Sequence, residues 1–222
     1  MIVGKNIHKS FGDVKVLKGV DIEIAAAEVL AITGSSGAGK TTLIQVLSSL
    51  EKVDHGEIYY DQQEISNYSS NKLAEFRNLN IGFVFQFHHL LAEFNSLENA
   101  MMPALIKGDS KKVAEEKALK LLTRLGLSHR LTHKPSELSG GEQQRLSTAR
   151  ALINQPKVVF ADEPSGNLDS ENADYFLSSE KNSNKLLSLS HTIGLWQNSA
   201  TARFQWWMEK LINKKALIKQ CL

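Results

Sequence analysis

The stretch GSSGAGKTT, from Gly34 to Thr42, constrains the fold of this 222-residue chain more than any other. It fits the pattern G-x-x-x-x-G-K-[ST], follows the apolar run EVLAIT and precedes TLIQVLSSL, whose apolar residues have helical spacing. A strand, a glycine-rich loop and a helix in this order place backbone N–H groups around phosphate oxygens at a helix N-terminus. The sequence therefore predicts an α/β fold with a phosphate site at this turn.

Residue types within the loop suit separate tasks. Glycines allow the backbone to turn its N–H groups inward, Lys40 would reach the β- and γ-phosphates, and the Thr41 hydroxyl would bind Mg²⁺. The alternative, a glycine-rich turn beside an unrelated lysine, is disfavoured by the flanking strand and helix. The predicted ATP-binding residues of the loop are Gly34, Ser35, Gly37, Ala38, Gly39, Lys40, Thr41 and Thr42.

A second apolar run, KVVFADEP (residues 157–164), ends in two carboxylates. An acid at the tip of a buried strand can reach a metal ion beside a phosphate loop, which is the role predicted for Asp162. Glu163 would orient or deprotonate the attacking water. Alone, this string also fits a strand that ends in solvated acids, but together with the phosphate loop it predicts nucleotide hydrolysis.

The segment LSGGEQQR (residues 138–145) carries a helix start of unusual composition. Ser139 and Glu142 have capping-box spacing, and apolar residues at helical spacing continue until Pro156 stops the helix. A capped helix does not require Gly140 and Gly141 in its first turn, whereas close approach of an anion does. Ser139, Gly140 and Gly141 therefore form a second predicted phosphate site, and two such sites in one chain indicate that two chains hold each nucleotide.

Composition excludes several other classes of protein. A hydrophobic content of 42% supports a sizeable core, and a net charge of +2 gives no reason to expect nucleic acid as a partner. No apolar run reaches the length of a membrane span, and the start MIVGKNIHKS lacks a secretory h-region, so we expect the chain in the cytoplasm. A single cysteine, Cys221, agrees with a reducing compartment. Four histidines lack metal-site spacing and are interpreted as surface or packing residues: His88, His89, His129 and His133.

These strings, in this order, resemble the ATP-binding subunits of ATP-binding-cassette (ABC) transporters over residues 1 to about 175. The resemblance implies that LSGGE contacts the γ-phosphate held by a second subunit. It also implies that Gln86, in FVFQ, touches Mg²⁺ and the attacking water, so that Glu163 and Gln86 are the predicted catalytic residues. SGNLD (residues 165–169) would cross the dimer interface. Phe11 would stack on adenine, although an aromatic residue in an early strand is more often part of the core.

The implied fold is α/β, a P-loop NTPase (RecA-like) core with an antiparallel β subdomain and an inserted α-helical subdomain. The expected organisation is one ATP-binding domain over residues 1–222, with a nucleotide-binding core at 1–87 and 156–178, a helical subdomain at 88–155 and an aberrant tail at 179–222. SKKVAEEKALKLLTRLG supports the insertion, because its apolar residues follow a helical spacing and Gly126 would end the helix. The predicted buried face is Val113, Ala114, Ala118, Leu121, Leu122 and Leu125.

The string FQFHHLLAEFNSLENAMMPALI resembles the lipoprotein-releasing and macrolide-export group, and most closely the lipoprotein-releasing ATPases of Gram-negative bacteria. This implies a homodimeric ATPase that drives integral membrane permease subunits from the cytoplasmic side of the inner membrane, as a peripheral protein. The alternatives are a macrolide- or peptide-type exporter and a relative that binds ATP but is impaired in hydrolysis. Five apolar residues of this string suit core packing and a docking groove equally well: Leu90, Leu91, Met101, Met102 and Leu105.

The last fifth of the chain departs from the family pattern. Relatives have a strand of the form FVIVTH, whose histidine contacts the γ-phosphate, and a later Asp-Gly turn, where this chain has LLSLSHTI and QWWMEKLI. The codons that Trp206, Trp207 and Met208 require, followed by the first two bases of the Glu209 codon, encode Val-Asp-Gly when read one base out of step. The same shift of residues 186–193 permits FVIVTHN.

This agreement of two strings in one shifted frame leads to a hypothesis of a single change of reading frame near residues 175–179. His191 then lies near the expected histidine by coincidence. We expect residues from about 180 onward not to pack as the family's last strands do. The ATPase activity of this chain is doubtful on this hypothesis, because the strand that carries the histidine is missing.

Overall fold

The computed structural model describes residues 1–26, 29–33, 35, 37–85, 87–162 and 186–191. The chain divides into two compact units, one of Met1–Leu73 together with the segment that begins at Leu186, and one that begins at Ala74 and continues to Lys185. The boundary between them falls inside helix α2 (Ser70–Asn80). Each unit is described in turn.

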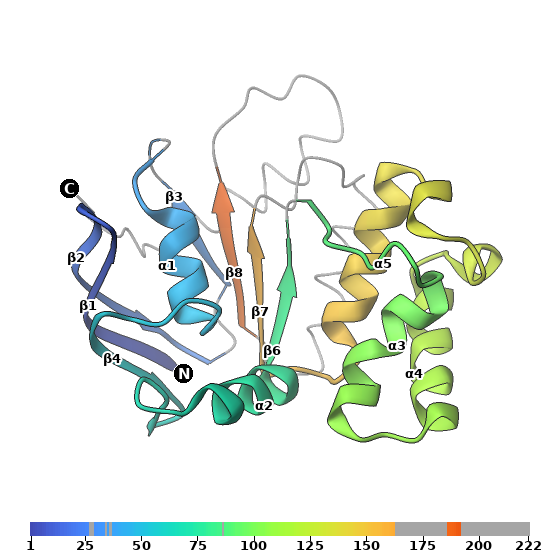
Figure 1. Cartoon of the computed structure of the whole chain (residues 1–222), viewed down its shortest axis with the longest axis horizontal. Coiled ribbons are helices and arrows are strands. Elements are labelled where there is room, and N and C mark those ends of the chain that lie inside the picture. Colours follow the sequence, from blue (N-terminus) through green and yellow to red (C-terminus); the bar gives the residue numbers. More distant parts are fainter. Residues whose placement is uncertain (27–28, 34, 36, 86, 163–185, 192–222) are drawn as a thin grey trace. The chain divides into compact units, whose positions relative to one another are not determined.

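An antiparallel sheet with the strand order β2-β1-β4-β5 makes up much of the first unit (Figure 1). Its strands are β1 (Ile2–Phe11), β2 (Val14–Ile24), β4 (His55–Tyr60) and β5 (Gln63–Glu64). Buried residues alternate along the long strands, and irregularities in the β1–β2 pairing, such as the one between Gly4 and Ile7, shift the phase of that alternation. The buried side chains of these strands include Ile2, Ile7, Leu17, Ile24, Ile58 and Tyr60.

Strand β3 (Val29–Thr33) leads through the glycine-rich loop into helix α1 (Lys40–Leu47), the order that the sequence predicts. The helix buries Leu43, Val46 and Leu47 together with Ile44, and the Tyr60 hydroxyl donates a 2.7 Å hydrogen bond to the Leu47 carbonyl. The predicted helical residue Leu50 is 41% exposed instead, because the helix ends at Leu47 and the chain turns at Ser49, whose φ is 57°.

Strand β8 (Leu186–His191) lies within the segment whose sequence departs from the family pattern. It pairs in parallel with β3 in a register that joins Val29 to Leu187 and Thr33 to His191. These six residues therefore form a strand, while the expectation that residues from about 180 onward do not pack as the family's last strands do stays a prediction. The segment LLSLSH contains no proline, glycine or formal negative charge, and a parallel ladder uses only backbone groups. Residues 192–222 lie outside the described part.

The second unit contains the parallel pair β6 (Ile81–Val84) and β7 (Val158–Asp162). Four successive residues of β7, Val158 to Ala161, are buried, which is typical of a strand covered on both faces. Gly82 of β6 lies against the end of helix α5, because a Cβ there would meet the Ala151 carbonyl oxygen at 2.5 Å.

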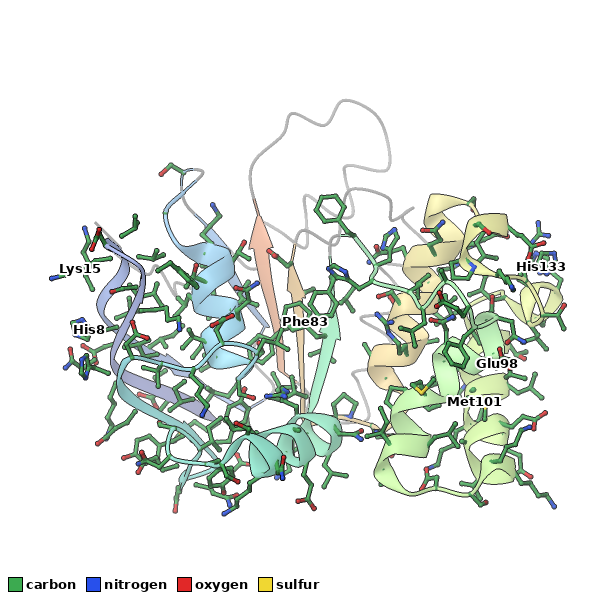
Figure 2. All side chains as sticks on the ribbon, in the orientation of Figure 1. His8, Lys15, Phe83, Glu98, Met101 and His133 are labelled. Atoms are coloured by element: carbon green, nitrogen blue, oxygen red, sulfur yellow. The ribbon has the colours of Figure 1, made fainter. Side chains whose placement is uncertain are left out.

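A group of three helices completes this unit: α3 (Ser96–Lys107), α4 (Lys111–Arg124) and α5 (Gly140–Leu152), with short 3₁₀ turns at Ser128–Arg130 and Pro135–Glu137 between α4 and α5 (Figure 1). Met101, 4% exposed, belongs to the shared apolar core, which resolves the ambiguity about this residue in favour of packing (Figure 2). Leu91 and Leu105 are 39% and 36% exposed. Leu90 is half-buried against the same core, and Met102 is half-buried too.

Helix α4 follows the predicted bounds with one correction to its buried face. Ala114, Ala118 and Leu122 are fully buried, and Gly126 ends the helix with a φ of 69°. Val113 is 41% exposed, although the sequence pattern placed it on the buried face. A residue one position away from Ala114 is rotated by about 100° around the helix, and small alanines keep the contact stripe narrow. Within the described ranges, no helix has the length and apolar character to cross a membrane.

Candidate nucleotide-binding site

Two described glycines of the loop have a backbone conformation that suits a phosphate cradle. Gly37 and Gly39 have φ values of 79° and 83°, in the left-handed region that side chains other than glycine adopt only with strain. Lys40 Nζ reaches back across the loop to the Ser35 carbonyl oxygen at 2.8 Å, and the Ala38 amide donates to the same oxygen at 3.3 Å. The loop is therefore a tight turn with the lysine folded over it.

The start of α1 and the loop before it suit the binding of a polyphosphate. Gly39 is the N-cap residue and makes no side-chain hydrogen bond to the helix start, and no acidic residue lies in the first turn. A Cβ added at Gly37 would meet no atom of the described residues within 4 Å. Thr41 is exposed and Thr42 half-buried, while Gly34 lies outside the described residues. An anion would thus face backbone N–H groups and the positive end of the helix dipole.

Phe11, the predicted adenine-stacking residue, ends β1 with 48% of its surface exposed. Lys9 Nζ lies 5.3 Å from the centre of its ring, and this ammonium group also donates to the Lys52 carbonyl oxygen at 2.8 Å. An exposed ring with a cation beside it can offer a surface to a base. The interpretation of Phe11 as a core residue is therefore wrong.

The acidic end of the second predicted strand is described only in part. Asp162 is the last residue of β7 and is half-buried, at the strand tip where the sequence placed it. Glu163, Gln86 and the segment 165–169 lie outside the described residues. Among the residues that the structure does describe, no cluster of histidine, cysteine and carboxylate side chains has the geometry of a metal site.

The LSGGE segment forms the predicted capping box at the start of α5. The Glu142 amide donates to Ser139 Oγ at 3.3 Å, and the Ser139 amide donates to Glu142 Oε2 at 2.8 Å. Ser139 and Gly140 are exposed and Gly141 is half-buried. The first turn of α5 therefore presents small, accessible residues at a helix N-terminus, as an anion site requires.

Glu142 has a further partner that sequence reasoning missed. Arg130 Nε donates to Glu142 Oε1 at 2.8 Å, so both carboxylate oxygens have partners and only 8% of the residue is exposed. The Ser139 amide, followed by Arg130, lowers the pKa of Glu142 to about 2. The acid of this segment consequently fixes the helix start and is charged at neutral pH.

The turn that follows Gln86 also depends on a residue that the sequence did not single out. His88 and His89 have φ values of 56° and 46°, and Arg150 of α5 donates from its two terminal nitrogens to their carbonyl oxygens, each at 2.7 Å. His88 is 7% exposed, so the interpretation of this histidine as a packing residue agrees with the structure. An arginine inside a helical pattern gives no sequence signal of such a distant contact.

Comparison with known proteins identifies the chain's family. The sequence profile of the ABC transporter family matches residues 17–166. The chain belongs to the ABC transporter family. The lipoprotein-releasing system ATP-binding protein LolD of Porphyromonas gingivalis is 56% identical over 170 residues, which are 77% of this chain and 78% of that protein. LolD of Bacteroides thetaiotaomicron is 54% identical over 172 residues, 78% of this chain and 79% of that protein.

Solved structures agree with this membership of the ABC transporter family. A dimeric post-hydrolysis state of the ATP-binding cassette MJ0796, bound to ADP and Pi, has a TM-score of 0.79 at 32% identity, over 86% of this chain and 88% of that chain. These matches confirm the predicted P-loop NTPase fold, with its antiparallel β subdomain and helices. They also confirm the predicted class, an ABC ATPase subunit similar to those of lipoprotein-releasing systems.

Proposed function

We propose that this chain hydrolyses ATP to drive the release of lipoproteins from the inner membrane. The observation that carries the proposal is its identity of 50% to 56% with lipoprotein-releasing ATP-binding proteins of several bacteria, over about three quarters of its length. This favours lipoprotein release over the macrolide- or peptide-exporter alternative.

In this proposal, the first unit binds the triphosphate of ATP. The left-handed Gly37 and Gly39 turn backbone N–H groups toward the β- and γ-phosphates, and Lys40 exchanges its contact with the Ser35 carbonyl for phosphate oxygens. Phe11 offers its exposed ring to adenine. Gly34, Ser35, Ala38 and Thr42 complete the loop.

The residues proposed to act in hydrolysis are Asp162, Glu163, Thr41 and Gln86. Mg²⁺, when bound by Thr41, Asp162 and Gln86, would neutralise charge that develops on the phosphate oxygens. Oxygen donors of this kind, together with the absence of acids from the first turn of α1, suit a site shared between a hard cation and a polyphosphate. Glu163 accepts a proton from the attacking water, and Gln86 helps to orient that water.

We further propose that two copies of this chain act as a homodimer. Ser139, Gly140 and Gly141 of one copy bind the γ-phosphate held by the other, because this accessible helix start has the chemistry of an anion site. The dimeric MJ0796 cassette supports such an assembly.

A surface of the second unit is proposed to contact the integral membrane permease, so that the chain works as a peripheral protein on the cytoplasmic side of the inner membrane. Exposed apolar side chains gather around the loop before α3 and at the end of that helix. They are Phe87, Leu91, Phe94, Leu105 and Ile106.

The first test is ATP hydrolysis by the purified full chain and by Lys40→Ala. We expect the variant to lose about a hundredfold or more of kcat/KM, because the phosphate loop loses its mobile positive charge. Lys15→Ala, which removes an exposed lysine of β2, is the matched control and should keep wild-type activity. A wild-type chain without ATPase activity, or equal activity in Lys40→Ala, would contradict the proposal.

A further inference from the structure

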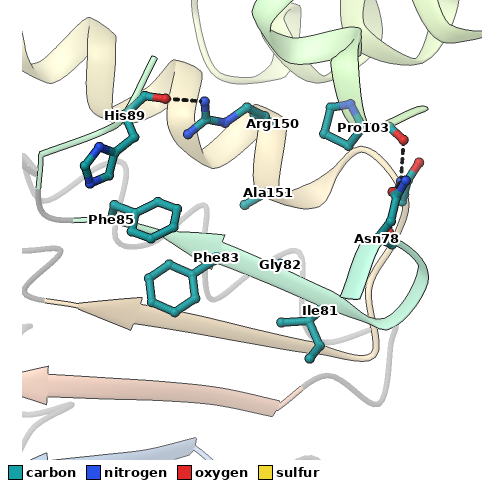
Figure 3. A pocket seen from close by; sticks show the side chains of 10 residues that line it. Asn78, Ile81, Gly82, Phe83, Phe85, His89, Pro103, Arg150 and Ala151 are labelled. Carbon is teal, nitrogen blue, oxygen red and sulfur yellow. Dashed lines mark hydrogen bonds between the residues drawn. The ribbon is translucent and has the colours of Figure 1, made fainter. Parts of the chain in front are cut away.

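The turn after Gln86 is closed by contacts from both sides. Within the turn, the His88 amide donates to the Phe85 carbonyl oxygen at 3.2 Å, and the His89 ring meets the Phe85 ring edge-on, with 4.8 Å between ring centres. From α5, the Arg150 guanidinium holds the carbonyl oxygens of His88 and His89. The contact with His89 is seen in Figure 3. Phe85, His89 and Arg150 also line a cavity of about 250 Å³ beside β6.

A guanidinium group is suited to this contact because its planar fork can bond two acceptors at once. Two consecutive histidines with positive φ are uncommon, and such a turn persists only where neighbouring groups hold it. Burial lowers the pKa of the Arg150 guanidinium, and burial together with Arg150 lowers the pKa of His88. Of the two residues, His88 is buried and Arg150 is half-buried.

Arg150 also lies on the helix that begins at the LSGGE segment. Gly140, the first residue of α5, and Arg150 are ten positions apart, which is about 15 Å along a helix axis, and α5 is uninterrupted between them. A displacement of the helix start would thus move the guanidinium together with the whole helix.

We propose that Arg150 is a positioning residue for ATP hydrolysis, which fastens the turn after Gln86 to the LSGGE helix. This rests on the proposed function, in which LSGGE contacts the nucleotide of the partner copy and Gln86 serves the nucleotide of its own chain. When the partner copy's nucleotide binds the start of α5, the helix shifts the turn that serves the nucleotide of its own chain. The two ATP sites of the dimer thereby become coupled through Arg150.

Hydrogen exchange of the full chain tests the fastening without any need for activity. In Arg150→Gln, amides in the peptide of residues 85–91 should exchange about tenfold faster than in the wild type, because the turn loses its outer contacts. In Arg150→Lys, these amides should exchange at a rate between those of the wild type and Arg150→Gln, since one ammonium group replaces the two-pronged contact of the guanidinium. Arg124→Gln, which removes an exposed arginine at the end of α4, is the control and should leave this peptide unchanged. Equal exchange in wild type and Arg150→Gln would overturn the proposal.

The ATP dependence of hydrolysis tests the coupling. In Arg150→Gln, kcat should fall about tenfold and the Hill coefficient should approach one, while the affinity for a fluorescent ATP analogue should change less than about twofold. A role in stability alone would lower the melting temperature and leave the Hill coefficient unchanged, and that result would overturn the coupling. If the wild type hydrolyses no ATP, the proposed function fails, whereas the exchange experiment still decides whether Arg150 holds the turn.

Discussion

Individual polar side chains in this protein hold the predicted phosphate sites in place. Glu142 joins the start of α5 to Arg130, and Lys40 folds over the loop that precedes α1. The capping pair of Ser139 and Glu142 could be predicted because its members lie three residues apart. Arg130 and Arg150 could not, because their partners are distant in sequence and any exposed helix or turn accommodates an arginine. His88 and His89 were equally hidden, since nothing in the sequence marks a left-handed histidine.

Glu142 gives the structure a pH dependence with a definite sign. Its pKa is about 2 in the folded chain, below the ordinary value of 4.5, so its stabilising contribution is complete above that ordinary value and is lost as the pH falls toward 2. Glu142→Gln should lower the free energy of unfolding by about 1–2 kcal/mol at neutral pH, through loss of a charge-assisted pair.

Denaturant titrations measure this effect. The difference between wild type and Glu142→Gln should shrink as the pH falls from about 5 to about 3, because the wild-type carboxylate becomes protonated on unfolding. Glu137→Gln, at an exposed glutamate of the preceding 3₁₀ turn, is the control. A difference that stays constant over this range would show that the charge of Glu142 does not contribute.

At the scale of elements, Asn99 organises the loop between β6 and α3. This buried side chain accepts from the Leu91 amide at 2.8 Å and donates to the carbonyl oxygens of Leu91, Phe94 and Asn95 at 2.8 to 3.0 Å. The loop it holds carries Leu91 and Phe94, two of the residues proposed to face the permease. One helix residue thereby fixes the backbone beneath that surface.

Replacing Asn99 with alanine should destabilise the chain by about 2–4 kcal/mol, because several buried backbone groups lose their partner. Thermal or denaturant unfolding measures this, with Asn67→Ala, an exposed asparagine bonded only to Glu64 among the described contacts, as the matched control at less than about 0.5 kcal/mol. Equal stability of the two variants would show that the loop does not depend on Asn99.

Sequence periodicity predicted where these helices and strands lie better than it predicted which of their residues are buried. The strands β3 and β7 and the helices α1, α4 and α5 lie where apolar spacing and caps placed them. Val113 was assigned to a buried face and is exposed, because a sequence pattern does not show which of two adjacent apolar residues meets its neighbour. Leu50 was assigned to helix α1 and lies beyond its end, because the pattern does not show where a helix ends. Strand β8 was missed since its sequence differs from the family's strand, although its composition permits pairing.

At the scale of the whole chain, the change of reading frame near residues 175–179 stays a prediction. The match to the P. gingivalis relative leaves unmatched shares of nearly equal size in both proteins, 77% and 78% being covered. The division into a core at 1–87 and 156–178, a helical subdomain at 88–155 and a tail at 179–222 likewise stays a prediction.

Restoring the frame should strengthen both stability and catalysis. We expect a chain that reads FVIVTHN in place of residues 186–192 to unfold at a higher denaturant concentration, and its kcat to rise about tenfold or more, since the histidine of this strand then reaches its family position. Sequencing the gene is the direct check. An unambiguous reading frame that continues into the present tail, together with no gain on restoration, would contradict the hypothesis.

The central claim is that two copies of this chain enclose ATP between the glycine-rich loop of one and the LSGGE helix of the other. The most direct test is the mass in solution of Glu163→Gln, measured by sedimentation with and without MgATP, since this variant should bind ATP but hydrolyse it slowly. We predict a monomer without nucleotide and a dimer with it, and reversal of the dimer by the further change Ser139→Arg, which blocks the helix start. A variant that binds ATP at saturation and remains a monomer would contradict the account.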